Sequence, residues 1–138
     1  MNIKKPTIMM IGLLLLTPLS IPSQVDAASS TFVTKGTTTK KVVALTFDDG
    51  SDGTNIAKIL SVLKSNQVKA TFFLTGSGAN NHPQSIKNIT TASPTHQIGN
   101  HSYSHPDFTT LSASQMTSEL SRTESLIRSL TGKTTKPI

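Results

Sequence analysis

Two short polar clusters hold the residues of this 138-residue chain that are best suited to chemistry. The first reads Thr-Phe-Asp-Asp-Gly over residues 46–50 and contains two adjacent carboxylates, Asp48 and Asp49. Adjacent residues on a regular strand face opposite sides, so both carboxylates can share a site only where the strand ends, and Gly50 allows such a turn. One carboxylate could then bind a cation while the other takes a proton from water. The alternative is a turn with two solvated acids.

The second cluster reads His-Ser-Tyr-Ser-His-Pro over residues 101–106. Histidines four residues apart, here His101 and His105, can converge on one metal ion if the segment between them coils. Pro106 disfavours helical geometry at His105, which favours a single tight turn over a long helix. Neutral imidazole nitrogens are good ligands for zinc, cobalt or nickel. The alternative is two surface histidines in a polar loop.

The elements that would position both clusters alternate between strands and helices. Apolar and β-branched runs predict strands at residues 42–47, 68–75 and 97–100, and helical spacing predicts helices at residues 54–65, 83–89 and 113–131. This alternation favours an α/β fold with a parallel sheet. Ligand sites in such folds lie at the carboxyl ends of strands, so we expect the two clusters to meet at one rim. Together they would supply the three ligands and the open position that catalytic zinc requires.

The remaining acids, histidines and glycines are predicted to have ordinary roles. Residues 76–78, Gly-Ser-Gly, lack the third glycine of a dinucleotide-binding loop and are expected to form a turn. The predicted roles are a helix cap for Asp52, a turn position for Asp107, exposed helix positions for Glu119 and Glu124, and surface loops for His82 and His96.

At these residues the chain resembles the polysaccharide deacetylases of the NodB-homology type, carbohydrate esterase family four. The resemblance covers about residues 41–138 and rests on residues 46–50, 70–73, 82–83 and 98–106. It implies the N-terminal part of a distorted β/α barrel, incomplete in this chain. It also implies a hydrolase of carbon–nitrogen bonds other than peptide bonds, which removes N-acetyl groups from peptidoglycan or a chitin-like glycan.

The resemblance also implies roles for individual residues. Asp48 would be the general base, and Asp49, His101 and His105 would hold a divalent metal, zinc before cobalt or nickel. The metal would polarise the acetamide carbonyl and acidify a bound water, and Ser102 would orient a ligand histidine.

The family also needs an Arg-Pro-x-Tyr type motif and a late histidine, and the chain reaches Ile138 about where the first of these would begin. The expectation is therefore a domain truncated after its second motif, with impaired activity. The alternative is a secreted remnant that binds metal or glycan without turnover.

The first residues are predicted to be an export signal. Lys4 and Lys5 precede an apolar stretch at residues 8–16, and small residues near Ala27 suit cleavage after residue 27. The apolar stretch is shorter than the roughly 20 residues of a membrane span, so no stable span is expected after cleavage. Residues 28–40, rich in Ser and Thr, are predicted to be a flexible linker. These features predict a bacterial protein that is secreted or associated with the cell wall.

Composition narrows the class of protein further. The chain has no cysteine, so its core must form without disulfides. Its net charge is +6, but it has no arginine-rich run and no aromatic residues interleaved with basic ones, which argues against a nucleic-acid partner. The oligomeric state is left open.

Overall fold

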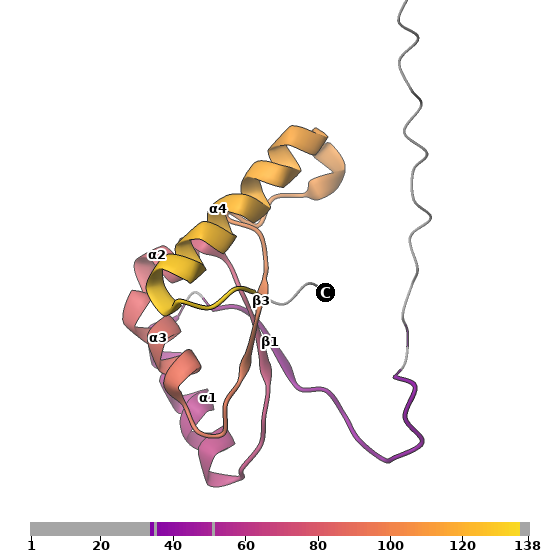
Figure 1. Ribbon diagram of the computed structural model, residues 1–138, viewed down its shortest axis with the longest axis vertical. Helices are drawn as coiled ribbons and strands as arrows, with labels where there is room; N and C mark the ends of the chain where they lie inside the picture. The colour runs from indigo at the N-terminus through magenta and orange to yellow at the C-terminus, as the bar shows by residue number, and fades with distance from the viewer. Residues whose placement is uncertain (1–33, 35, 51, 136–138) are drawn as a thin grey trace, which may run out of the picture. The chain divides into compact units, whose positions relative to one another are not determined.

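The computed structural model describes residues 34, 36–50 and 52–135, and the chain separates into two units, Met1–Thr39 and Lys40–Ile138. The predicted export signal, residues 1–27, lies outside the described residues. Every described helix and strand belongs to the second unit (Figure 1). Within the described ranges, no helix combines the length and the apolar character needed to cross a membrane.

A parallel sheet of three strands forms the centre of the second unit, in the order β1 (Thr46–Asp49), β2 (Thr71–Leu74) and β3 (Gln97–Asn100). Its register places Phe47, Phe72 and Ile98 side by side. The next residue of each strand puts Asp48, Phe73 and Gly99 on the opposite face. Consecutive parallel strands joined through helices confirm the predicted α/β class.

Helices follow the strands along the chain and cover one face of the sheet (Figure 1). They are α1 (Gly53–Ser65), α2 (Gly76–Asn81), α3 (Pro83–Thr91) and α4 (Ala113–Thr131), with a short 3₁₀ turn, η1 (Phe108–Thr110), before α4. The predicted capping box of Ser112 and Gln115 is present at the start of α4, and Gly132 ends that helix with φ 68°. Local signals therefore set both ends of α4 where the sequence predicts them.

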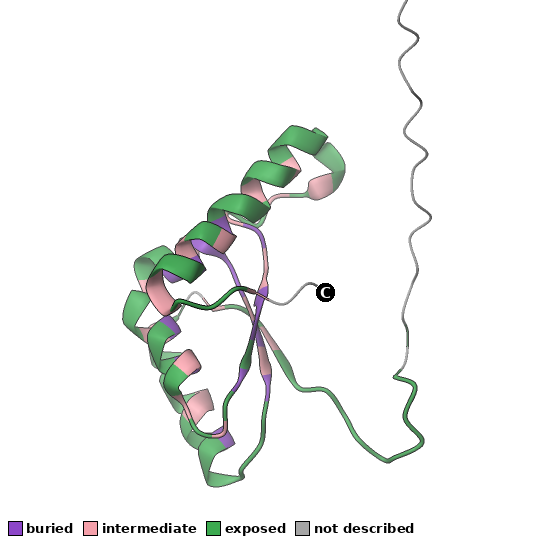
Figure 2. Cartoon of the chain, viewed as in Figure 1, coloured by how far each residue is buried: buried purple, intermediate pink, exposed green. Residues whose placement is uncertain are grey.

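The apolar core lies between the helices and the sheet (Figure 2). Phe72 and Leu74 of β2 pack there with Ile86 and Ile89 of α3 and Ile127 of α4, all fully buried. Burial of these side chains stabilises the helices against the sheet. The outer faces of the helices are exposed.

One predicted strand and one predicted turn differ from the structure. The first strand was expected at residues 42–47, but β1 begins at Thr46, and Val42 and Val43 are 64% and 93% exposed. The reason is that β2 begins only at Thr71, whose N–H pairs with Leu45 O, so earlier residues have no neighbouring strand among the described residues.

Residues 76–78 start helix α2 instead of forming a turn. Thr75 caps this helix by accepting a hydrogen bond from the Gly78 N–H at 3.1 Å. Glycine is required at position 78 because an added Cβ would lie 2.9 Å from the backbone oxygen of Asp49. The start of α2 thus packs closely against the end of β1.

Candidate metal centre

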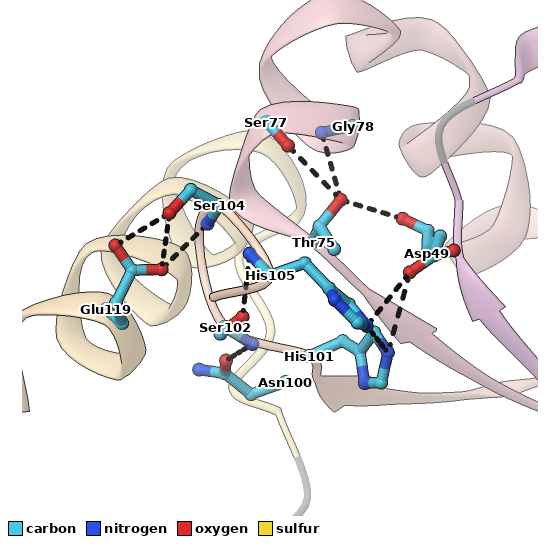
Figure 3. A network of polar contacts seen from close by, with 10 residues as sticks. All are labelled: Asp49, Thr75, Ser77, Gly78, Asn100, His101, Ser102, Ser104, His105 and Glu119. Atoms are coloured by element: carbon cyan, nitrogen blue, oxygen red, sulfur yellow. Dashed lines mark hydrogen bonds and ion pairs between the residues drawn. The ribbon is translucent and has the colours of Figure 1, made fainter. Parts of the chain in front are cut away.

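Asp49, His101 and His105 meet at the carboxyl ends of β1 and β3 (Figure 3). Asp49 Oδ1 lies 3.5 Å from His101 Nε2 and 3.7 Å from His105 Nε2. The two Nε2 atoms are 3.1 Å apart. The structure therefore brings one carboxylate and two imidazoles of the predicted site to one point, as the parallel sheet leads us to expect.

The donor set and its spacing fit a divalent cation. Ligand atoms about 2.0–2.2 Å from a tetrahedral zinc ion lie roughly 3.3–3.6 Å from one another, close to the separations seen here. Asp49, His101 and His105 are the acidic and histidine residues that could jointly hold an ion within the described part of the chain. Their side chains are 54%, 27% and 62% exposed, so a water or a substrate group can reach the same point.

Asp48 occupies a different position from its neighbour. It pairs with Phe73 in the register of the sheet, whereas Asp49 pairs with Leu74. Asp49 has φ 69°, and this left-handed conformation directs the end of the strand so that its carboxylate faces the histidines. Asp48 is exposed and its carboxylate accepts no hydrogen bond from the described residues. The structure places Asp48 next to the three-residue group but not in it.

The segment from His101 to His105 forms a tight loop, as Pro106 predicts, and two of its residues have positive φ. Ser102 has φ 63° and His105 has φ 56°. Residues other than glycine keep such angles only when surrounding contacts hold them. Ser102 Oγ accepts the His105 N–H at 3.1 Å, so Ser102 acts on the backbone of a histidine and not on its ring.

Neighbouring elements hold the rest of this loop. Asn100 Oδ1 accepts the Ser102 N–H at 3.0 Å. The Gly76 and Ser77 N–H groups at the start of α2 donate to the Ser102 and Tyr103 carbonyls, both at 2.9 Å. These contacts attach the loop to β3 and to α2.

Glu119 of α4 is the functional candidate that the sequence analysis missed. Its carboxylate accepts the N–H groups of Tyr103 and Ser104, and its side chain is only 13% exposed, so the prediction of an exposed position is wrong. The pKa of Glu119 is lowered, above all by the hydrogen bond from the Ser104 N–H. Partial burial raises this pKa but does not outweigh the hydrogen bonds. Glu119 lies four residues before the buried Thr123, and this helical spacing was a signal that it faces inward.

Other polar residues divide between confirmed and corrected roles. Asp52 caps α1, as predicted, and Asp107, predicted to be a turn residue, caps the 3₁₀ turn η1. His96 is buried, with Nδ1 accepting the Ala70 N–H at 3.2 Å, so its predicted surface role is wrong. Burial lowers the pKa of His96. Glu124 is half-buried and accepts both the N–H and the hydroxyl of Thr135.

Comparisons with known proteins identify the family of the chain. A family model described as polysaccharide deacetylase matches residues 35–138. The chain is 42% identical over 98 residues to the peptidoglycan-N-acetylmuramic acid deacetylase PdaA of Bacillus subtilis, covering 71% of this chain and 36% of that protein. It is 44% identical over 93 residues to a peptidoglycan-N-acetylglucosamine deacetylase of Bacillus cereus, covering 67% of this chain and 33% of that protein.

A solved structure is also similar to this chain. The peptidoglycan deacetylase PdaC of Bacillus subtilis superposes with a TM-score of 0.66 at 34% identity, covering 70% of this chain and 47% of that chain. This chain spans about a third of the length of the curated relatives it matches. The family model and these relatives show that the chain belongs to the polysaccharide deacetylase family.

Proposed function

We propose that this chain supplies the metal-binding part of an enzyme that removes N-acetyl groups from a cell-wall glycan. The observation that carries the proposal is the convergence of three side chains: a ligand atom of each of Asp49, His101 and His105 lies within 4.8 Å of the other two. The family and its peptidoglycan deacetylases support the reaction class. Because the chain spans about a third of those relatives, we assign metal binding to these residues and turnover to a protein of the relatives' length.

Asp49, His101 and His105 would hold the cation, with zinc preferred over cobalt or nickel. Two imidazoles and one carboxylate are a ligand set that leaves an open position on zinc. When bound, the cation would polarise the acetamide carbonyl and make a water acidic enough to attack it near neutral pH.

Asp48 would act as the general base. It is exposed, adjacent to Asp49 and free to accept a proton from the attacking water, since no described residue donates to it. The water oxygen bonds to the carbonyl carbon, the carbon–nitrogen bond breaks, and the nitrogen takes a proton as the sugar amine leaves. Acetate is the second product, and a general acid supplies the proton that the amine receives.

Peptidoglycan is the proposed substrate class, with either N-acetylglucosamine or N-acetylmuramic acid as the reacting sugar. Relatives named for each of these sugars match the chain about equally well, at 44% and 42% identity. A chitin-like glycan would offer the same acetamide group. We also propose that the protein is exported, with residues 1–27 as the signal, because its substrate would lie outside the membrane.

A chimera tests this proposal. Residues 40–138 would replace the matching segment of the Bacillus subtilis relative PdaA. Acetate release from the glycan substrate of PdaA would be measured with and without zinc. We expect zinc-dependent release that Asp48→Asn abolishes while zinc binding persists. A folded chimera that binds zinc and releases no acetate would contradict the proposal.

A further inference from the structure

Glu119 lies where α4 passes the loop that carries the two histidines (Figure 3). Its Oε2 atom accepts the Tyr103 N–H at 2.9 Å and the Ser104 N–H at 2.7 Å. The Ser104 hydroxyl donates to the same carboxylate at 3.1 Å. Successive backbone N–H groups that point the same way form a site for an anion, and Glu119 supplies that anion from within the chain.

These two N–H groups lie between His101 and His105 in the loop. They are flanked by Ser102 and His105, whose φ angles of 63° and 56° need support from outside the loop. Glu119 is the acceptor of both N–H groups within the described part of the chain. Its removal would let the turn relax toward ordinary backbone angles, and His105 would then move relative to His101.

Arg122 secures the same loop through a side chain. Its guanidinium lies 3.7 Å from the centroid of the Tyr103 ring, a cation–π contact, and its Nη1 is 4.0 Å from Glu119 Oε1. Tyr103 is thus held at its backbone by Glu119 and at its ring by Arg122. Two residues one helical turn apart on α4 therefore act on a single loop residue.

We propose that Glu119 is a positioning residue of the metal centre, which holds the loop in the conformation that brings both histidine Nε2 atoms to Asp49. This inference rests on the proposed function, because it assumes that the centre binds a cation. It assigns α4 a part in metal binding although no residue of α4 belongs to the ligand group.

The experiment compares zinc affinity, by competition with a chelator, in the full chain and in variants at two glutamates of α4. Glu119→Ala should raise the Kd for zinc by about 10–100-fold, as loss of a hydrogen-bond partner at a metal site does. Glu119→Gln should raise it less, because its amide oxygen can still accept both N–H groups but without the negative charge. Glu124→Ala is the matched control, since Glu124 binds Thr135 and not the loop, and it should leave the Kd unchanged.

A second readout needs no metal. In the metal-free chain, the amide protons of Tyr103 and Ser104 should exchange about tenfold faster in Glu119→Ala, as loss of hydrogen bonds to a charged group implies. Wild-type zinc affinity in a folded Glu119→Ala chain would overturn the proposal. If that variant does not fold, an unchanged Kd and unchanged amide exchange in Glu119→Gln would overturn it instead. Failure of the wild-type chain to bind zinc would refute the proposed function, and the amide exchange would still decide the role of Glu119.

Discussion

The two sides of the candidate metal centre differ in how firmly the chain holds them. Every backbone N–H from His101 to His105 has an acceptor, supplied in turn by Leu74, Asn100, Glu119 and Ser102. On the other side, Asp49 ends β1, an edge strand of the described sheet. Its backbone is held by β2 and by the Thr75 N–H and hydroxyl, but its carboxylate contacts only the two histidines among the described residues.

The difference indicates a division of roles between the ligands. The two nitrogen ligands are placed before any cation arrives, which reduces the entropic cost of binding. Because no described residue other than the two histidines contacts it, the Asp49 carboxylate can adjust to the ion that the nitrogens have positioned. We therefore expect changes on the histidine side to have larger effects than changes on the aspartate side.

His101→Ala should have the largest effect. It removes the less exposed of the two nitrogen ligands. Zinc affinity should fall by more than about 100-fold, because loss of a ligand should cost more than loss of a residue that only hydrogen-bonds to a ligand. Isothermal titration with zinc measures the loss. His82→Ala is the matched control, because His82 lies outside the ligand group, and its affinity should equal that of the wild type.

Gly76→Ala tests how tightly the histidine loop is packed. An added Cβ would overlap the ring of Tyr103, so the free energy of unfolding should fall by about 1–3 kcal/mol, as overpacking of a core typically costs. Urea denaturation measures this change. Tyr103 is the only tyrosine of a chain without tryptophan, so its fluorescence in the folded state should change as well.

Gly132→Ala provides the comparison for Gly76→Ala. Its Cβ would meet nothing, and only its φ of 68° opposes the substitution, so it should destabilise by about 1 kcal/mol and leave the fluorescence of Tyr103 unchanged. Equal fluorescence changes in both variants would show that Gly76 has no special contact with the loop.

Asp49→Asn tests the aspartate side of the metal centre. The amide oxygen remains available as a ligand but has no charge, so zinc affinity should fall by about tenfold, well short of the His101 effect. Asp52→Asn is the control, because asparagine caps a helix as well as aspartate does. A loss in Asp49→Asn that equals the loss in His101→Ala would contradict the proposed division of roles.

The smallest expected effect concerns pH and a residue outside the centre. Burial lowers the pKa of His96, so the folded chain favours the neutral form of this side chain. The stability that neutral His96 contributes is therefore fully present at a pH above the ordinary histidine pKa of 6.5. Stability should decline as the pH falls below 6.5, because the unfolded chain then binds more protons. Urea denaturation at pH 7.5 and 5.5 should show a smaller decline in His96→Gln than in the wild type. An equal decline in both would exclude His96 as the cause.

Local signals in the sequence predicted the elements whose ends are set by neighbouring residues. The capping box at Ser112 and the glycine at position 132 gave the bounds of α4, and β3 was also predicted at its observed residues. The meeting of Asp49 with the two histidines followed from a general property of parallel sheets, whose strands all end at one edge. That property needs no knowledge of individual contacts.

Features that depend on distant residues were missed. The start of β1 depends on where β2 begins, about 25 residues later, so the apolar run at residues 42–45 was misleading. His96 follows a polar stretch typical of a surface loop, yet it binds the backbone of Ala70. Glu119 was assigned to the exposed face of α4, because the loop N–H groups that make its burial favourable are 15 and 16 residues away.

We propose above that Asp49, His101 and His105 bind one cation together. A zinc titration of the ¹⁵N-labelled chain, followed through the ring nitrogens of its four histidines, tests it most directly. We predict that the Nε2 signals of His101 and His105 shift together and saturate at one zinc per chain, while those of His82 and His96 stay unchanged. Separate saturation of His101 and His105, or shifts at His82 or His96 instead, would show that the three residues do not share one ion.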